Sequence, residues 1–479
     1  MAAALNALGR HIALAGFMGA GKSTLGPVVA ERIGRAFRSA DAELEARAGR
    51  TIAEIFAVDG EAVFRALEEQ VVADLLAAGE PAVIELGGGA VTSAATRELL
   101  RRSAFTVLVE IGLDEAWRRA EGSGRPLALD SERFAALYEE RQPVYEAVAD
   151  GHARDADGVV LAAAGVHVET GALEQLGEHV PGTGPVEVVI DRHVSGIHGV
   201  TVQLGLGSRD VAVHEVPQGE PAKTAAVLER LWSAFRVGRD GMIVGVGGGA
   251  TTDVAGLAAA TYMRGVPWTA VPTTLVGQVD AGLGGKTAID LPGAKNIVGA
   301  FHWPARVVVD PAVLTTLPEG ERLNGMAEVV KTGLLAGAPL WELGDRELVS
   351  RCCAYKAAVC LRDPYDQGFR NVLNLGHTFA HALEAAAGYE LSHGRAVALG
   401  LTAALRLSGL DEERRMVESV LSPEKAAVDR DAAWAALQRD KKATGGSPRL
   451  VLLDAPGRPR HCVEVDPGDV RRALDELIA

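Results

Sequence analysis

The sequence GFMGAGKST, Gly16–Thr24, decides the fold of the first third of the chain. It matches the pattern GxxxxGK[ST], in which glycines let backbone N–H groups point at phosphates and the following helix supplies its positive end. The apolar run HIALAGF (11–17) precedes this loop and a helical stretch (22–33) follows it, as the pattern requires. We therefore expect a P-loop in which Lys22 reaches the β- and γ-phosphates of ATP and the Ser23 hydroxyl holds Mg²⁺.

A second glycine-rich turn, VGGGATTD (Val246–Asp253), also follows an apolar run and precedes a helical stretch. A glycine triplet alone predicts a tight turn without a ligand at least as well as a nucleotide site. Asp191 favours the nucleotide, because it ends the apolar run VEVVID (186–191), where an acid would accept a hydrogen bond from a ribose hydroxyl. Two unlike glycine turns, each opening its own series of strands and helices, predict two enzymes fused end to end.

Length and composition predict an ordinary globular protein of several domains. The 479 residues correspond to three domains at about 150 residues each. The net charge of −15 is spread along the chain, which argues against nucleic-acid binding. No apolar run is long enough for a membrane span, and the apolar start leads directly into the P-loop and not into a signal-peptide pattern. The four cysteines form no CxxC pairs, which predicts neither disulfides nor thiolate zinc and fits a reducing cytoplasm.

Alternating strand and helix patterns predict an α/β fold with parallel sheets covered by helices. In the first part, AVIELGGG (82–89) and AFTVLVEI (104–111) are further strands, and the Ala-, Gly- and Asp-rich stretch 153–165 marks a boundary. A second alternating run has strands at VEVVID, DGMIVGVGGG (240–249) and WTAVPTT (268–274). Its amino-terminal edge is short, so the first strand of this part is left open.

The pattern becomes helical after Pro318, with LNGMAEVVKTGLLAG (323–337) and RNVLNLGHTFAHALEAAAG (370–388) as helices. The strand pattern RLVLLDA (449–455) has no place in this scheme. We expect three domains, which are a P-loop domain at 1–160, a Rossmann-like NAD-binding domain at 165–317, and a mainly helical metal- and substrate-binding domain at 318–479.

The residues around the P-loop narrow its chemistry. Asp41 follows the second strand, and the motifs GEAVFRALEE, GGGAV, GRPLA and ERQPVY supply Arg65, Gly88, Arg125 and Arg141. A single arginine is more often a solvated surface residue, but the order of these motifs resembles shikimate kinase over roughly residues 10 to 160. A small acid with a carboxylate needs arginine forks, and phosphoryl transfer needs positive charge around the γ-phosphate.

The resemblance implies a role for each of these residues. Asp41 would bind the ring hydroxyls of shikimate and orient or deprotonate the one that is phosphorylated. Arg65 and Arg141 would bind the carboxylate, with Gly88 beside the ring, and Arg125 would lie on a mobile lid and touch the transferred phosphate. Catalysis would fall to Lys22, Asp41 and Arg125. The implied ATP contacts are Gly19, Ala20, Gly21, Lys22, Ser23, Thr24 and Arg125.

One position departs from the shikimate kinase pattern. The family usually has Asp-x-Asp after the second strand, whereas this chain has Ser39-Ala40-Asp41. The first carboxylate normally helps to hold the water shell of Mg²⁺, so this chain relies on Ser23 alone or binds the metal more weakly. The alternative is therefore a degenerate kinase half that serves for regulation or binding.

A group of acid and imidazole side chains lies in the helical part, at Glu328 in GMAEVVK, His377 and His381 in NLGHTFAH, and His393 in LSHGRAV. A carboxylate and two imidazoles with open positions form a catalytic divalent-metal set. Spacing alone predicts both His377 and His381 as ligands, although Thr378 replaces the Glu of HExxH. A helical His is more often a surface or core residue, but three within 17 positions favour a metal site.

Together with the second glycine turn, these motifs resemble 3-dehydroquinate synthase over roughly residues 165 to 460. The resemblance makes Glu328, His377 and His393 the ligands of Zn²⁺ or Co²⁺, and places His381 beside the substrate phosphate instead. The implied NAD contacts are Asp191, Glu220, Lys223, Gly249, Ala250, Thr251, Thr252, Asp253, Thr273, Thr274, Lys286, Lys295, Val313, Leu314, Thr315 and Thr316. The implied sugar-phosphate contacts are Arg264, Asp280, Lys286, Asn296, Lys331, Lys356, Arg370, Asn374, His381, Lys441 and Lys442, with Lys286, Asn374 and His381 also catalytic.

The chemistry implied by this resemblance explains the cluster. NAD⁺ oxidises one alcohol of a seven-carbon sugar acid phosphate, and the metal polarises that oxygen. Phosphate leaves, the hydride returns, and the ring closes, so NAD⁺ is not consumed. Related sugar-phosphate cyclases share NAD, metal and fold, but Arg264, Lys356, Arg370, Asn374 and His381 favour the dehydroquinate-forming member.

One loop motif of the second part departs from the 3-dehydroquinate synthase pattern. In RDPYDQGFR, Pro364 and Asp366 stand where the family more often has the two glutamates of DExE, and we expect a local effect on that loop. The leading hypothesis is a bifunctional enzyme of the shikimate pathway, dimeric through its synthase half. A kinase fused to a secondary-metabolite cyclase is the rival.

Overall fold

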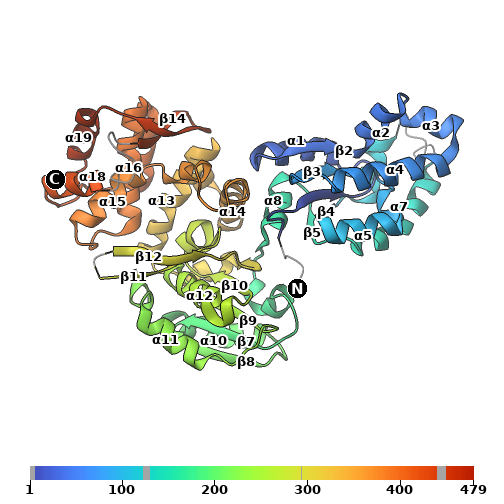
Figure 1. Cartoon of the computed structure of the whole chain (residues 1–479). Coiled ribbons are helices and arrows are strands. Elements are labelled where there is room, and N and C mark those ends of the chain that lie inside the picture. Colours follow the sequence, from blue (N-terminus) through green and yellow to red (C-terminus); the bar gives the residue numbers. More distant parts are fainter. Residues whose placement is uncertain (1–5, 122–129, 293, 440–448) are drawn as a thin grey trace. The chain divides into compact units, whose positions relative to one another are not determined.

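The computed structural model describes residues 6–121, 130–292, 294–439 and 449–479 (Figure 1). The chain forms two compact units. The first contains the residues up to Val166 together with Ala357–Arg362, and the second contains His167–Lys356 and Asp363–Ala479. The division at Val166 lies next to the Ala-, Gly- and Asp-rich stretch at which we expected a boundary.

The first unit is built on a five-stranded sheet of order β2-β3-β1-β4-β5, and every neighbouring pair is parallel. Its strands are β1 (His11–Ala15), β2 (Ala36–Ser39), β3 (Ala82–Glu85), β4 (Ala104–Val109) and β5 (Gly151–Ala153). The central strands β1 and β4 are buried along their whole length, as expected for a parallel sheet covered by helices. The expected strands at 82–89 and 104–111 are confirmed as β3 and β4.

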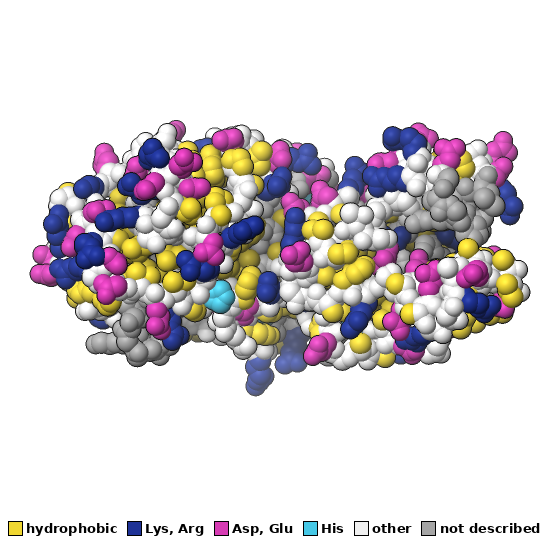
Figure 2. Space-filling model, turned by 90° about the horizontal axis from the view of Figure 1, so that it is seen from above, with side chains coloured by type: hydrophobic (Ala, Val, Ile, Leu, Met, Phe, Trp, Pro, Cys, Tyr) yellow, Lys and Arg dark blue, Asp and Glu magenta, His cyan; other side chains and the backbone are white. Residues whose placement is uncertain are grey.

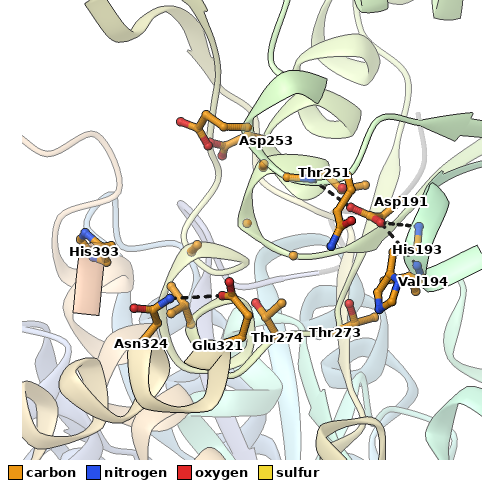
Figure 3. A pocket seen from close by; sticks show the side chains of 18 of the residues that line it. Asp191, His193, Val194, Thr251, Asp253, Thr273, Thr274, Glu321, Asn324 and His393 are labelled. Carbon is orange, nitrogen blue, oxygen red and sulfur yellow. Dashed lines mark hydrogen bonds between the residues drawn. The ribbon is translucent and has the colours of Figure 1, made fainter. Parts of the chain in front are cut away.

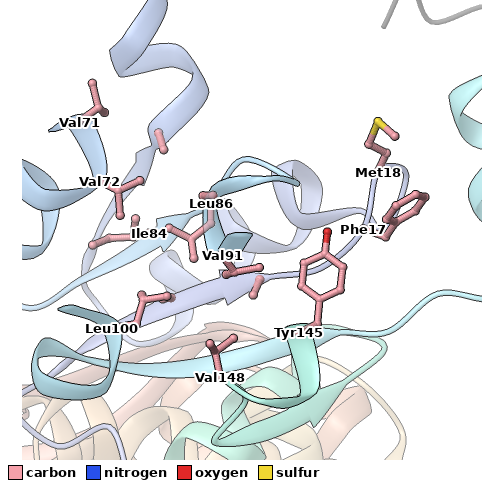
Figure 4. Close-up of a cluster of buried hydrophobic side chains, with 14 of the residues drawn as sticks. Phe17, Met18, Val71, Val72, Ile84, Leu86, Val91, Leu100, Tyr145 and Val148 are labelled. Atoms are coloured by element: carbon pink, nitrogen blue, oxygen red, sulfur yellow. The ribbon is translucent and has the colours of Figure 1, made fainter. Parts of the chain in front are cut away.

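Eight helices accompany this sheet in the described residues. They are α1 (Lys22–Arg32), α2 (Ala40–Ala48), α3 (Ile52–Val58), α4 (Gly60–Leu76), α5 (Ala94–Ser103), α6 (Leu113–Ala120), α7 (Ser131–Glu146) and α8 (Ala156–Ala164). Figure 4 shows part of the core, a single buried cluster that contains Ile84 and Leu86 together with Val72 of α4, Leu100 of α5 and Tyr145 of α7. This packing fixes the carboxyl ends of β1, β2 and β3 side by side.

The second unit contains a six-stranded sheet of order β6-β13-β10-β9-β7-β8. Its strands are β6 (Val166–Val168), β7 (Val186–Asp191), β8 (Val211–Val216), β9 (Met242–Gly247), β10 (Trp268–Pro272) and β13 (Arg306–Val309). From β13 to β8 all neighbouring pairs are parallel. The chain passes from β7 outward to β8 and then returns to the other side of β7 with β9. A crevice therefore opens at the carboxyl ends of β7 and β9, the place where open α/β sheets bind ligands.

The sheet of the second unit is followed by a hairpin and a helical part. The hairpin pairs β11 (Lys286–Leu291) with β12 (Ala294–Phe301) in antiparallel register. The helices of this unit are α9 (Leu176–His179), α10 (Arg192–Gly205), α11 (Ala225–Ala234), α12 (Gly249–Thr261), α13 (Glu319–Ala336), α14 (Asp345–Arg362), α15 (His377–Ala386), α16 (His393–Ser408), α17 (Asp411–Leu421), α18 (Arg430–Arg439) and α19 (Pro467–Asp475). Of α14, only the part up to Lys356 belongs to this unit. The strand pattern 449–455 is β14, paired with β15 (Arg458–Glu464).

The expected single helix at 370–388 is wrong. A short 3₁₀ segment, η8 (Phe369–Asn374), comes first, and α15 begins only at His377. Between them Gly376 has φ of 79°, a left-handed conformation that interrupts the helical path. As a result His377 is the first residue of α15, just as His393 is the first residue of α16.

Charged side chains of both signs are interspersed over the visible face of each unit (Figure 2). Within the described residues, no helix has the length and hydropathy needed to cross a bilayer. Cys352, Cys353, Cys360 and Cys462 are free thiols.

The close crossing of α15 and α16 gives a test of this fold. A Cβ atom on Gly400 would lie 2.1 Å from the carbonyl oxygen of Gly376, too close for any side chain. We expect Gly400→Ala to lower the unfolding free energy of the second unit by about 1–3 kcal/mol, because overpacking a tight contact costs that much. Thermal unfolding followed by calorimetry measures this change.

The matched control is Gly320→Ala on α13, where a Cβ would meet nothing within 4 Å. This substitution should be neutral or slightly stabilising, since alanine favours helix over glycine. Equal unfolding temperatures for the two variants would contradict the close crossing.

Candidate active sites

The P-loop of the first unit lies between β1 and α1, as predicted. Gly21 has φ of 89° and directly precedes Lys22, the first residue of α1. The Lys22 ammonium is buried and donates hydrogen bonds to the carbonyl oxygens of Gly16 at 2.7 Å and Phe17 at 3.2 Å. These bonds hold a cation inside the loop, where phosphate oxygens would be its stronger partners.

A cavity of about 790 Å³ opens beside this loop. Its lining brings together every residue that we predicted for shikimate binding, namely Asp41, Arg65, Gly88 and Arg141, with the predicted P-loop residues Gly19–Thr24. Predicted Arg125 lies outside the described residues. Arg119 and Arg154, which the sequence did not single out, also line the cavity, and Arg119 Nη1 donates to the carbonyl oxygen of Gly19 at 3.0 Å.

Two arginines define the far end of this cavity. Arg141 is buried and donates from Nη1 to the carbonyl oxygen of Gly88 at 3.0 Å, and the Tyr145 hydroxyl donates to the same oxygen at 2.5 Å. Arg65 Nη1 contacts Glu68 Oε2 at 2.6 Å. Burial raises the pKa of Glu68 against the opposing effect of Arg65. Glu68 was missed from sequence, although its spacing of three from Arg65 on one helix was a usable signal.

The glycine run Gly87–Gly89 is required for these side chains to approach one another. A Cβ on Gly87 would lie 2.3 Å from a carboxylate oxygen of Glu68 and 2.8 Å from one of Asp41. A Cβ on Gly89 would lie 2.1 Å from Arg65 Nη1. The glycines thus make room for two carboxylates and an arginine within one small cavity.

A second cavity of about 790 Å³ lies in the second unit, at the crevice between β7 and β9 (Figure 3). Of the residues predicted for NAD, those lining it are Asp191, Glu220, Lys223, Gly249, Ala250, Thr251, Asp253, Thr273, Thr274, Lys295 and Thr316. Predicted Thr252, Lys286, Val313, Leu314 and Thr315 lie outside this lining. The glycine turn after β9 and the acid after β7 therefore share one cavity, as the strand order requires.

Two acidic side chains of this cavity accept hydrogen bonds from other groups of the protein. Asp191 caps α10, accepting from the backbone N–H groups of His193 at 2.8 Å and Val194 at 3.3 Å. Asp253 accepts from buried Lys223 Nζ at 2.8 Å, and burial raises the pKa of Asp253 to about 6 although Lys223 opposes this. Lys223 also contacts the amide oxygen of Asn296, a predicted sugar-phosphate residue that lines the same cavity.

Glu328, His377 and His393 come together at the wall of this cavity, as predicted for the metal. Glu328 Oε1 lies 2.9 Å from His393 Nε2 and 3.5 Å from His377 Nε2, and the three ligand atoms lie within 4.8 Å of one another. Two imidazoles and one carboxylate with open positions fit Zn²⁺ or Co²⁺. His381 is not part of this group in the described residues, so the expectation from spacing alone was wrong. His381 and His393 line the cavity itself.

Neighbouring groups orient these ligands. His377 Nδ1 lies 3.2 Å from the carbonyl oxygen of Leu375, and His393 Nδ1 lies 3.0 Å from Glu384 Oε1. Burial disfavours the charged form of His393, but Glu328 and Glu384 outweigh this and raise its pKa to about 10. The carboxylates of Glu328 and Glu384 therefore favour a positive charge at this cluster. Glu384 was missed from sequence because its contact depends on how α15 and α16 cross.

Buried charges surround the carboxylate of Glu328. Its second oxygen pairs with buried Lys331, and Lys356 pairs with Asp280. Burial disfavours the charged form of Asp280, but Lys331 and Lys356 outweigh this and hold its pKa at about 2. Arg370 is also buried and donates to the carbonyl oxygen of Gly284 at 2.9 Å. Asp280, Lys331 and Lys356 thus form a charged network with the metal-group residue Glu328, whereas Arg370 bonds to the backbone.

The other predicted sugar-phosphate residues are more scattered. Asn374 and Arg264 are exposed and lie outside the cavity lining. Lys286 is also exposed, pairs with Asp366 at 2.5 Å, and does not line the cavity. Lys441 and Lys442 lie outside the described residues. The structure therefore brings only part of the predicted set together.

Comparison with known proteins now places both units. Residues 213–324 match the family model for the N-terminal part of 3-dehydroquinate synthase, and residues 325–443 match its C-terminal part. A 3-dehydroquinate synthase of Gloeobacter violaceus is 38% identical over 343 residues, which cover 65% of this chain and 95% of that relative. The chain belongs to the 3-dehydroquinate synthase family. Residues 18–165 match the shikimate kinase family model, so a shikimate kinase domain precedes the synthase.

Two further proteins are similar to the second unit. The 3-dehydroquinate synthase of Thermobifida fusca is 42% identical over 282 residues, covering 52% of this chain and 75% of that relative. The solved 2-epi-5-epi-valiolone synthase ValA from Streptomyces hygroscopicus, with NAD⁺ and Zn²⁺ bound, is 26% identical. It covers 65% of this chain and 96% of its own, with a TM-score of 0.58.

Glu384 gives a test of the metal group. We expect Glu384→Gln to weaken zinc binding by about 10–100-fold, because a partner that orients a ligand imidazole contributes that much to metal affinity. Zinc retained against a chelator of known affinity measures the effect. Glu390→Gln, an exposed neighbour, is the control and should bind as the native protein does. Equal retention in both variants would contradict the orienting role.

Proposed function

We propose that this synthase-family chain catalyses two non-consecutive steps of the shikimate pathway. The first unit transfers the γ-phosphoryl group of ATP to shikimate. The second converts 3-deoxy-D-arabino-heptulosonate 7-phosphate to 3-dehydroquinate and phosphate. The observation that carries this proposal is that each cavity joins a glycine turn to the side chains that its reaction needs. These are Asp41 with Arg65 and Arg141 in the first, and His393 of the metal group in the second.

In the first cavity, ATP would supply the phosphoryl group and Mg²⁺ would neutralise part of its charge. Lys22 would exchange the carbonyl oxygens of the loop for β- and γ-phosphate oxygens. Arg65 and Arg141 bind the carboxylate of shikimate by paired hydrogen bonds. Asp41 orients the hydroxyl group and accepts its proton, since phosphoryl transfer depends on positioning the attacking oxygen. We assign Arg125 to the transferred phosphate.

In the second cavity, Glu328, His377 and His393 would hold Zn²⁺ or Co²⁺, which would supply a Lewis acid for an alcohol oxygen, and NAD⁺ bound in the crevice would supply reversible hydride transfer. The residues lining the crevice of β7 and β9 bind NAD. The buried charges Asp280, Lys331, Lys356 and Arg370 bind the sugar acid phosphate together with Arg264, Lys286, Asn296, Asn374, His381, Lys441 and Lys442. Lys286, Asn374 and His381 assist proton transfer.

We further propose which part of the synthase unit binds each ligand and how the unit assembles. Residues 165–317 bind NAD and residues 318–479 bind the metal and substrate. The unit forms a homodimer, which is supported by exposed apolar side chains on α10 (Val200, 72% exposed, and Leu204, 76%) and on β12 (Ile297, 63%). The enzyme acts in the cytoplasm on small molecules and does not bind nucleic acid.

The two reactions release different products, so one preparation tests both. We expect Lys22→Ala to lower shikimate-dependent ADP release by about 100-fold or more, because it removes a charge that stabilises the transition state. The same variant should release phosphate from the sugar acid phosphate at the native rate. His393→Ala should lose phosphate release and retain ADP release.

The outcomes separate the alternatives. If Lys22→Ala did not change ADP release, the first unit would be a binding or regulatory module. If the native protein formed a different carbocycle and no 3-dehydroquinate, the second unit would be a related sugar-phosphate cyclase. If activity survived both chelation and His393→Ala, the metal assignment would be wrong.

Glu68 tests how shikimate is bound. We expect Glu68→Gln to raise the KM for shikimate by roughly tenfold with a smaller effect on kcat, because a charge-assisted hydrogen bond that positions Arg65 contributes about 1.5 kcal/mol. Steady-state kinetics at saturating ATP measure both constants. The control is Glu69→Gln on the same helix, which contacts Ser93 instead and should keep the native KM. An equal KM in both variants would refute the positioning role.

A further inference from the structure

One acid of the first cavity has no role in the mechanism above. Glu85 is the last residue of β3, is only 8% exposed, and lines the cavity next to the P-loop. Its Oε1 accepts a hydrogen bond from the Ser23 hydroxyl at 2.5 Å. Ser23 is the P-loop residue expected to hold Mg²⁺. A buried carboxylate is costly unless a partner compensates its charge, and a neutral hydroxyl does so only in part.

The strand register explains why an acid at this position matters. Ser39, which replaces the expected first carboxylate, is the last residue of β2, and Glu85 is its direct partner on β3. The sheet order β2-β3-β1 places Glu85 one strand nearer to the P-loop than Ser39. Glu85 on β3 thus carries an acid directly beside the β2 position where Ser39 replaces the expected one.

Ser39 itself has a structural role. Its hydroxyl oxygen accepts from the backbone N–H of Ala42 at 3.4 Å and caps α2. Aspartate would cap this helix equally well, so capping alone does not require serine here.

The position of Glu85 matches the requirements of magnesium chemistry. P-loop enzymes hold Mg²⁺ between the Ser or Thr of the loop and a carboxylate at the end of a neighbouring strand. Mg²⁺ prefers oxygen ligands and is usually bound by one or two carboxylates together with water and phosphate. Because Ser23 donates its hydrogen to Glu85, the lone pairs of the Ser23 oxygen are available to a cation. The contact therefore places the negative charge of Glu85 beside the metal position. It also orients the hydroxyl oxygen of Ser23 toward a cation.

We propose that Glu85 supplies the carboxylate that anchors Mg²⁺ in the kinase site, in place of the one absent at position 39. The metal would be held by Ser23 and Glu85, directly or through water, beside the phosphates of the nucleotide. This inference rests on the kinase function proposed above. It removes the reason to regard Ser39 as a sign of a degenerate site, because the negative charge is retained on the adjacent strand.

The test uses Mn²⁺ as a paramagnetic probe in the full-length chain. The metal site of the synthase is first filled with Zn²⁺, and only the Mn²⁺ binding that depends on ADP is counted, by electron paramagnetic resonance. We expect Glu85→Gln to weaken this binding by about 10–100-fold. Glutamine keeps the shape and can still accept the Ser23 hydrogen bond, so the change removes the charge alone. The control is Glu80→Gln, at an exposed position two residues before β3. This variant should bind Mn²⁺ as the native protein does.

A second measurement separates metal anchoring from a structural role. Without metal, Glu85→Gln should bind ADP as tightly as the native protein or more tightly, because a negative charge beside the phosphates has been removed. If Glu85 only supported the loop, ADP would bind more weakly with and without metal. That result would overturn the proposal.

Moving the carboxylate back to β2 provides the rescue. The single variant Glu85→Ser should lose ADP-dependent Mn²⁺ binding, and the double variant Ser39→Asp/Glu85→Ser should recover most of it. If the double variant recovered no Mn²⁺ binding, a carboxylate at position 39 could not replace the one at position 85, and the proposal would be contradicted. If Glu85→Gln bound Mn²⁺ like the native protein while shikimate was still phosphorylated, this inference would fail and the kinase function would stand. If the native protein showed neither ADP-dependent Mn²⁺ binding nor phosphorylation, both would fail.

Discussion

Both active sites depend on one constraint, which is that parallel strands end together at one edge of a sheet. In the first unit, β1 runs into the P-loop and α1, while β2 and β3 end at Ser39 and Glu85 on the same edge. In the second, β7 ends at Asp191 and β9 at the glycine turn that opens α12. Residues far apart in sequence meet there, and the backbone N–H groups at the start of a helix face them. The remaining side chains of each site are arranged around this edge.

The two sites use charge in different ways. The first cavity gathers Lys22, Arg65 and Arg141 around space for phosphate and carboxylate groups, and three acids, Asp41, Glu68 and Glu85, lie among them. The second buries opposite charges against one another, as in the pairs of Glu328 with Lys331 and Asp280 with Lys356. Removing one member of a buried pair leaves an uncompensated charge and is strongly destabilising. The second site is therefore more tightly coupled to the stability of its own unit.

The sequence predicted the parts of these sites that are determined locally. The P-loop and the turn after β9 follow from residue type and spacing, whereas the trio of Glu328, His377 and His393 came from the family resemblance, because spacing alone pointed to His377 and His381. The residues that sequence missed depend on long-range packing. Glu384 contacts His393 only because α15 crosses α16, and Glu85 is significant only because of its register with Ser39. The break at Gly376 was missed because the flanking residues continue a helical pattern.

We propose that each chain carries two separate nucleotide sites, one for a phosphate donor and one for a redox cofactor. Isothermal titration of a single preparation with ADP and with NAD⁺, each in the presence of saturating amounts of the other, tests this directly. We expect one ADP and one NAD⁺ to bind per chain, with neither displacing the other and with only ADP binding weakened in Lys22→Ala. Competition between the two nucleotides, or a total of one nucleotide per chain, would contradict it.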